Sequence, residues 1–258
     1  MSRLEELQEL RRRKCRLTPE RALESPDEAE AFLRDRGLLT RTTDCALPSL
    51  YEACHESPAA GERGGFGAWP ATKWWWAGAL GERPGVHLLK VHRGKNLFLT
   101  DESVALVDPI CRSELDRMHA ADPGWRRLLD HLAATGPSEP EDLQRELDLK
   151  ARELKALRLP LERCGAIVSR QVVHPTADGG HRHSSVLARW DQAYPDAARG
   201  GGFMDLLVAA VRAAVVAPEP ELRRWFSWTW LFDDGLVDGL VADGWIERPA
   251  AGWVAATP

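Results

Sequence analysis

The 258-residue chain has no long apolar segment, and its first residues are charged rather than apolar. Its longest apolar run, residues 206–217, is interrupted by Arg212, whereas a helix that spans a bilayer needs about 20 consecutive apolar residues. Residues 1–14 are rich in charge and have a helical pattern, unlike the apolar core of a signal peptide. We therefore expect a cytoplasmic protein that does not associate with membranes.

Cysteines are few, and none of the 5 forms a CxxC pair. Scattered cysteines in a cytoplasmic protein are usually reduced and buried. His181 and His183 could place two imidazoles on one face of a strand, but the neighbouring sequence offers no clear third or fourth ligand. We therefore predict no metal and no cofactor. A metal- or haem-handling protein built on Cys54, His55 and these histidines is an alternative that lacks the usual ligand spacing.

An excess of basic residues is absent too. The chain carries 34 basic and 39 acidic residues, a net charge of −5, and residues 193–258 hold most of the acidic surplus. Proteins that bind nucleic acid often contain a basic domain. Any DNA-binding surface must therefore be a local patch on a nearly neutral body, with an affinity that is modest and sensitive to salt.

The common catalytic motifs are also missing. The sequence contains no P-loop, HExxH, GxSxG or GxGxxG pattern, so none of the enzyme classes that these motifs mark is indicated. The histidines and carboxylates of residues 44–102 stand in no recognised catalytic spacing. The residues alone therefore do not indicate which reaction, if any, the protein catalyses.

Residues 137–190, in contrast, have the pattern of a complete winged-helix module. Ser138, followed three residues later by Glu141, predicts a capping box at the start of a helix. Leucines at helical spacing continue into a second helix that ends at Gly165. Two strands and the glycine-rich turn between them follow, at 166–173, 185–190 and 174–183. Such a module usually docks its second helix on DNA and lays its wing on the backbone.

The basic side chains of this segment are the candidate DNA contacts. Those on the second helix could pair with phosphates or guanine edges, and those of the turn could contact phosphates or the minor groove. A solvated helix face and an inert loop are the alternatives. The predicted DNA-binding residues are Lys150, Arg152, Lys155, Arg158, His181, Arg182 and His183.

Further helices and hairpins are predicted on both sides of this segment. Ser25 and Pro26 begin a helix that runs to Gly37, a hairpin over 86–100 precedes a helix that starts at Asp101, and a weaker pattern of helices and a hairpin closes the chain. We expect an α+β, mainly helical fold of tandem winged-helix modules with small β-hairpins and a central cleft. The predicted parts are a helical and winged-helix part with an aromatic-rich hairpin (1–135), a winged helix (136–192) and a winged-helix-like module (193–258).

Tryptophan is unusually frequent, with 11 residues, and several of them cluster. An indole can stack on an extruded base, although most tryptophans serve as large apolar core residues. From the run at 74–76, Trp74 and Trp75 are the predicted base-stacking residues.

Four segments together resemble a known family. They are LRDRGLLTRTTDCALPSLYEACHE, WPATKWWWAGAL, HLLKVHRGKNLFLTDE and RELKALRLPLERCGAIVSR. With the winged-helix pattern, they make the chain similar to the AlkZ/YcaQ-type winged-helix DNA glycosylase superfamily, and within it to the AlkZ-related proteins. The resemblance implies tandem winged helices around a central channel, and an activity that releases alkylated bases or unhooks interstrand crosslinks.

The resemblance also implies where a site would lie. In those enzymes a QxQ or QxD motif orients the water that attacks the sugar. That motif aligns here with residues 40–42, and no glutamine lies between Gln8 and Gln144. The family histidine that follows the motif aligns with His92. The principal element of the family's site is therefore absent, and a second one is kept.

Two hypotheses follow for the function. The first is a winged-helix protein that binds double-stranded DNA and is tied to DNA damage; if it is catalytic, Asp44 places the water, and His92 and Arg41 stabilise the departing base or the sugar charge. The second is a non-catalytic regulatory or accessory protein that binds a protein or small-molecule partner. The sequence predicts no oligomeric state.

Overall fold

The structure is a computed structural model that describes residues 1–58, 69–176, 179–197 and 200–257. The predicted α+β, mainly helical chain with small β-hairpins is confirmed, because helices hold about half of the residues and the strands form small antiparallel sheets. Among the described residues, no helix is both long and apolar enough to cross a membrane.

The first part of the chain holds short helices and one three-stranded sheet. Its elements are α1 (Arg3–Lys14), η1 (Pro19–Arg21), α2 (Pro26–Arg36), β1 (Leu38–Thr40), α3 (Leu50–Ala53), α4 (Trp76–Gly81), β2 (Val86–His92) and β3 (Lys95–Thr100). The sheet order is β1-β3-β2. As predicted, α2 starts after Ser25, whose hydroxyl accepts a hydrogen bond from the Glu28 amide, and ends at Gly37 with a φ of 78°.

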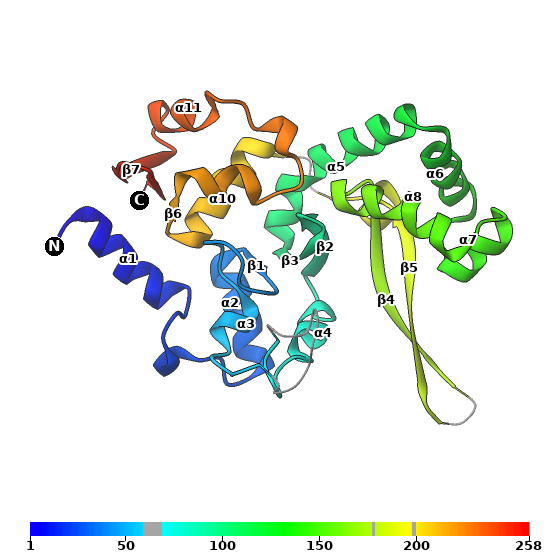
Figure 1. Ribbon diagram of the computed structural model, residues 1–258, viewed down its shortest axis with the longest axis horizontal. Helices are drawn as coiled ribbons and strands as arrows, with labels where there is room; N and C mark the ends of the chain where they lie inside the picture. The colour runs from blue at the N-terminus through cyan, green and yellow to red at the C-terminus, as the bar shows by residue number, and fades with distance from the viewer. Residues whose placement is uncertain (59–68, 177–178, 198–199, 258) are drawn as a thin grey trace.

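The middle part is a helical arm with a long hairpin, shown in green to yellow in Figure 1. Its elements are α5 (Asp101–Ala121), α6 (Pro123–Thr135), α7 (Pro140–Glu146), α8 (Ala151–Cys164), β4 (Ile167–Pro175), β5 (His181–Arg189) and α9 (Trp190–Ala193). The last part packs beside the first. Its elements are α10 (Phe203–Ala214), β6 (Val216–Pro218), η2 (Glu219–Arg224), η3 (Thr229–Leu231), α11 (Leu236–Ala242), β7 (Ile246–Ala250) and β8 (Trp253–Ala256).

One topology occurs three times along the chain. In the first part, β1 follows α2, the helices α3 and α4 come next, and β1 pairs with the second strand of the β2-β3 hairpin. In the last part, β6 follows α10 and pairs with β8, the second strand of the closing hairpin. In the middle part a bridge between Ser138 and Leu187 of β5 takes the place of the first strand. Each part therefore runs helix, strand or bridge, helices, hairpin.

Two local predictions for the middle part were wrong. Ser138 does not cap α7: its backbone forms both hydrogen bonds of the bridge with Leu187, each of 2.9 Å, and Glu139 is the N-cap, directly before Pro140. Five of the eight described residues of the predicted turn at 174–183 are strand, because cross-strand pairing continues to Pro175 and His181. The hairpin therefore projects as a long β-ribbon (Figure 1), and residues 177–178 of the predicted turn lie outside the described residues.

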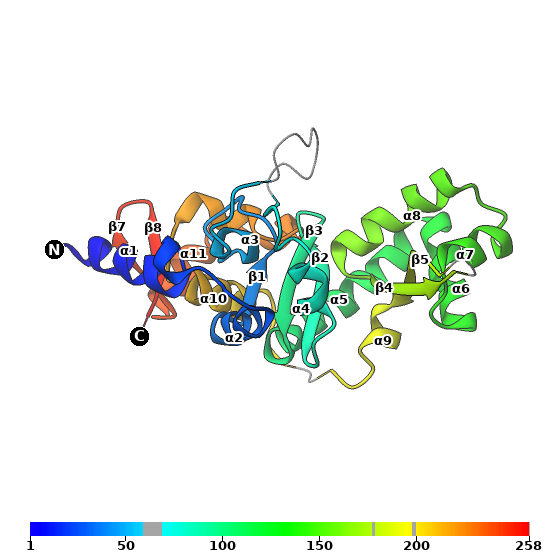
Figure 2. The ribbon, with the colours of Figure 1, turned by 90° about the horizontal axis from the view of Figure 1, so that it is seen from below.

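The largest apolar cluster contains residues of all three parts, while a second cluster lies within the first part and a third beneath α1. The largest cluster runs from Leu38 in the first part through Leu161 in the middle part to Val254 near the end of the chain. Helix α5 lies between the body that holds both termini and the arm of α6, α7 and α8 (Figures 1 and 2). The predicted boundaries at 135/136 and 192/193 therefore separate segments that share one core.

All five cysteines are free thiols. Four are buried and Cys45 is partly buried. Burial raises the pKa of Cys15 to about 11 and of Cys45 to about 12. These thiols therefore stay protonated near neutral pH, and the low-pKa thiolate that marks a reactive cysteine is absent at both positions.

Candidate functional site

The turn between β2 and β3 is the first component of the site. Arg93 and Gly94 have φ values of 54° and 78°, the positive values that a two-residue hairpin turn of type I′ requires. His92 and Lys95 are paired across the turn. Because directly opposed residues of an antiparallel pair project to the same face, the turn presents an imidazole and an ammonium group together, with Arg93 between them.

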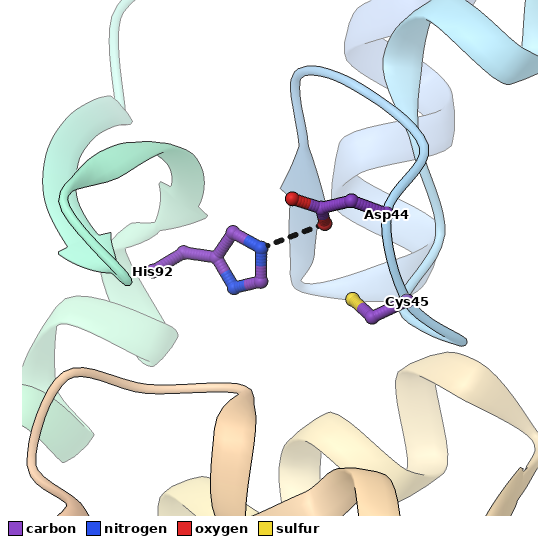
Figure 3. Close-up of side chains that lie close together, drawn as sticks. All are labelled: Asp44, Cys45 and His92. Carbon is purple, nitrogen blue, oxygen red and sulfur yellow. Dashed lines mark hydrogen bonds and ion pairs between the residues drawn. The ribbon is translucent and has the colours of Figure 1, made fainter.

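The second component is the loop that carries Asp44. It leaves β1 and is closed at its base by a parallel bridge between Thr40 and Ser49 and by a 2.8 Å hydrogen bond from the Thr40 amide to the Pro48 carbonyl. Asp44 therefore projects from a closed loop. Figure 3 shows its carboxylate directed at the His92 ring.

Three cationic or hydrogen-bonding side chains of the turn meet this carboxylate. His92 Nε2 lies 2.9 Å from Asp44 Oδ1, Arg93 Nη2 lies 2.7 Å from Asp44 Oδ2, and Lys95 Nζ forms an ion pair with the same Oδ2. Burial opposes ionisation of Asp44, but the hydrogen bonds from Lys95 and His92 and the charge of Arg93 outweigh it and lower the pKa to about 2. The carboxylate is therefore ionised near neutral pH.

His92 ties the turn to the last part of the chain. The side chain is 1% exposed, and its Nδ1 lies 2.5 Å from the carbonyl oxygen of Trp225. The ring is therefore held from both sides, by the carboxylate of Asp44 and by the carbonyl of Trp225. Arg93 and Lys95 place two positive charges around the single negative charge of Asp44, so the cluster has a net positive charge.

A metal ion does not fit this cluster. Ligand atoms of Asp44, Cys45 and His92 lie within 4.8 Å of one another, as Figure 3 shows. However, burial raises the pKa of the Cys45 thiol to about 12, and a metal needs the thiolate. Arg93 and Lys95 already neutralise the carboxylate and would repel a divalent cation.

Arg41, the third predicted catalytic residue, takes part in a different contact. Its guanidinium lies 4.7 Å from the centroid of the Trp69 ring, and Trp69 in turn stacks with Trp74 at 6.4 Å between centroids. Burial lowers the pKa of Arg41. The structure thus brings together Asp44 and His92, and places Arg41 with the predicted base-stacking residue Trp74.

The predicted stacking residues are exposed. Trp74 and Trp75 expose 53% and 49% of their surface, while the neighbouring Trp76 is buried at 5%. Trp75 also packs edge-on against Trp76, with 6.3 Å between ring centroids. Neither exposed indole lines the groove beside α8 or the arginine-rich pocket, both of which are described below.

The predicted contacts on α8 fall into two groups. Lys150 and Arg152 are exposed at the start of the helix. Lys155 and Arg158 instead line a groove of about 550 Å³ between α8, β2 and the β4-β5 ribbon. In the same groove, Lys90 Nζ lies 2.7 Å from an oxygen of the buried Glu162. The second helix of this segment therefore forms a wall of a groove.

The three predicted wing residues lie on β5 and are exposed. Arg182 is within 3.2 Å of a Glu141 oxygen and 3.7 Å of a Glu139 oxygen. The amide nitrogen of Gln171, on β4, lies 3.0 Å from Nδ1 of His183. Arg182 thus spans from the ribbon to the start of α7.

Sequence reasoning missed two members of the cluster, Arg93 and Lys95. The signal was available: a two-residue turn at Arg93-Gly94 between two apolar strands places residues 92 and 95 opposite one another. It also missed a pocket with four arginines, from positions 93, 117, 163 and 224. These residues are too far apart in the sequence for any spacing to connect them.

Comparison with known proteins adds no identification: no family model, no curated protein and no solved structure matches the chain.

Proposed function

We propose that this protein binds duplex DNA through three winged-helix modules. The observation that carries the proposal is the topology repeated in all three parts, in which a hairpin follows helices and its second strand pairs with an earlier strand or bridge. This is the order of secondary structure in winged-helix domains, whose usual ligand is DNA. The resemblance to the AlkZ/YcaQ-type superfamily points the same way.

The distribution of charge supports a local contact surface on a chain with a net charge of −5. Lys150 and Arg152 at the start of α8 and His181 on the ribbon are exposed, and Lys155 continues the same helix into the groove. Phosphates contacted by such side chains release counterions. In this proposal the groove between α8, β2 and the ribbon is the central cleft.

Within this function, we assign Asp44 the role of holding the basic turn in place. A pKa of about 2 makes its carboxylate a weak base toward water, since a general base works best with a pKa near the working pH. Both of its oxygens are also occupied, Oδ1 by His92 and Oδ2 by Arg93 and Lys95. The net positive cluster suits a phosphate better than the cationic sugar that forms when a glycosidic bond breaks.

Base excision is the second candidate, and one observation favours it. The two residues expected to act together, Asp44 and His92, lie in contact at 2.9 Å. Release of alkylated purines and unhooking of crosslinks are measured with wild type and Asp44→Asn. Product from wild type that is lost in Asp44→Asn would establish excision. If both proteins give only as much product as buffer alone, base excision is excluded and DNA binding without catalysis remains.

Duplex binding is tested by fluorescence anisotropy with a labelled blunt duplex. The triple variant Lys150→Ala, Arg152→Ala, Lys155→Ala should weaken binding by about tenfold or more, since each side chain contacts a phosphate in this proposal. Arg12→Ala is the matched control, because Arg12 is equally basic and exposed but lies on α1. Equal affinity of wild type and the triple variant would contradict the assigned surface. No binding by wild type would favour the protein-partner alternative.

A further inference from the structure

A pocket of about 460 Å³ lies beside the Asp44 cluster, outside the groove of α8 and the ribbon. It is bounded by α5, α6, the end of α8, the β2-β3 turn and the segment from η2 to η3. Arg93 belongs to both sites, because it lines the pocket and pairs with Asp44. The alkyl stem of Arg163 packs over the same turn, with two carbons 3.8 Å from the position of a Cβ on Gly94. The pocket volume lies in the range typical of small-ligand sites.

Four arginines line this pocket, and two of them have a carboxylate partner. Arg117 pairs with the buried Glu114 at 2.6 Å, and Arg93 pairs with Asp44. Within the described part of the chain, no carboxylate lies within 4.0 Å of Arg163 or Arg224. Two of the four guanidinium groups therefore remain unneutralised around one concave site, which is the arrangement that binds phosphate through bidentate hydrogen bonds.

Two buried polar atoms in the lining have unused hydrogen-bonding capacity. Ser227 is 7% exposed, and its hydroxyl finds no hydrogen-bond partner among the described residues. The same is true of Nε of Arg93. Buried polar groups are nearly always satisfied in folded proteins, so an orphaned one in a pocket wall indicates a missing partner.

The pocket also presents aromatic surface. Trp230 is 53% exposed, and the Arg117 guanidinium lies 4.8 Å from the centroid of its ring. Trp125 and the buried Phe226 complete this side of the pocket. Exposed indoles next to guanidinium groups form a surface on which a base stacks while its phosphate is held nearby.

We propose that this pocket binds a nucleotide, with its phosphate on Arg163 and Arg224 and its base against Trp230. Ser227 and Arg93 Nε supply hydrogen bonds from the pocket wall. The nucleotide is either a free mononucleotide or a terminal or extruded unit of a DNA strand, and both present the same chemistry. The proposal stands independently of the duplex-binding surface, because the pocket shares no lining residue with the groove of α8 and the ribbon.

Isothermal titration calorimetry of the full chain tests it with five probes: deoxyadenosine monophosphate, deoxyadenosine, inorganic phosphate, a short single strand and a blunt duplex. The proposal expects the mononucleotide or the single strand to bind more tightly than either phosphate or deoxyadenosine. The double variant Arg163→Ala, Arg224→Ala should weaken that binding by about tenfold or more. Both side chains are exposed, so the fold tolerates their removal.

Two further variants test whether nucleotide binding depends on the residues that line the pocket or only on positive charge nearby. Arg223→Ala removes the neighbouring arginine, which pairs with Asp234 at 3.3 Å and does not line the pocket, and it should leave nucleotide binding unchanged. Trp230→Ala should weaken nucleotide binding and leave phosphate binding unchanged.

The outcomes are distinct. Tighter binding of the mononucleotide supports a free nucleotide as the occupant, and tighter binding of the single strand supports a DNA unit. Failure of both to bind, equal affinity for phosphate and nucleotide, or an equal loss in Arg223→Ala would overturn the proposal. Duplex binding in the Arg163, Arg224 variant reports on the proposed function separately, because that surface is untouched.

Discussion

Asp44 illustrates how one side chain connects distant segments of this protein. It comes from the loop after β1, and its three partners come from the turn after β2. Through His92 the contact extends to the Trp225 carbonyl. Removing the carboxylate would therefore loosen the contact among three segments, two from the first part of the chain and one from the last.

The pH dependence of stability should reveal this cluster. The folded pKa of Asp44, about 2, lies below the ordinary value of 3.8, so its contribution is fully present above about pH 5 and is lost as the pH falls through the folded value. Asp44→Asn should lower the free energy of unfolding near neutral pH by about 1–2 kcal/mol, allowing for partial exposure. It should also flatten the decline of stability between about pH 5 and 2. Urea unfolding across this pH range measures the free energy of unfolding of both proteins. Parallel plots of this free energy against pH for wild type and Asp44→Asn would contradict the role assigned to Asp44.

Asp108 should matter more to stability than any exposed charge. It is fully buried and accepts hydrogen bonds from Arg112 Nε at 2.9 Å and from Trp190 Nε1 at 2.7 Å. Asp108→Ala leaves the Trp190 indole N–H without its acceptor and the Arg112 guanidinium without its carboxylate, which we expect to cost about 3 kcal/mol or more. Asp130→Ala is the control, because the pair of Asp130 with His119 is exposed. Urea midpoints that shift equally in both variants would refute this ranking.

At this scale the sequence indicated the right residue types but not their grouping. Asp44 and His92 were both singled out, and they meet. Arg41 was assigned to the same site, yet its side chain stacks on Trp69, because a strand ending at Thr40 fixes its direction by tertiary packing that no local pattern reveals. The places of Arg93 and Lys95 in the cluster could have been predicted from the two-residue turn, whereas no sequence pattern connects the arginines of the pocket.

Among the elements, the helix ends were the most predictable features. Gly165 ends α8 with a left-handed φ of 82°, as expected for a glycine after a helix. Ser138 was misassigned because a good N-cap residue can equally lie in a β-bridge, and the bridge partner Leu187 is far away in the sequence. The ribbon was predicted too short because strand pairing overrode the turn-forming preferences of its sequence.

Gly165 provides a test of how closely the elements pack. A Cβ at this position would overlap the sulfur of Cys111 on α5, and the positive φ adds backbone strain. Gly165→Ala should lower the free energy of unfolding by about 2–3 kcal/mol. Gly136→Ala is the matched control, since its φ is 85° but, among the described residues beyond its chain neighbours, no atom lies within 4 Å of the place a Cβ would take. It should cost about 1 kcal/mol; equal losses in thermal or urea unfolding would show that the contact with Cys111 is unimportant.

At the scale of the whole molecule, the largest apolar cluster connects the three parts. The main core contains residues from Leu38 to Val254 and includes all three parts, although the sequence suggested separable modules. Repeated short patterns predict modules, but they do not show that the modules bury their apolar faces against one another.

A shared core predicts a single cooperative unfolding transition. Tryptophan fluorescence and far-UV circular dichroism should report the same urea midpoint, because losing one part exposes the core of the others. Two separated midpoints would show that the parts fold independently, in which case the boundaries at 135/136 and 192/193 would divide true domains.

The salt dependence of duplex binding tests the central proposal most directly. If about three side chains contact phosphates, the affinity for a blunt duplex should fall about 40-fold between 50 and 200 mM salt, and the triple variant at positions 150, 152 and 155 should show a much shallower slope. An affinity that does not change with salt, or a slope that is the same in the variant, would contradict DNA binding through this surface.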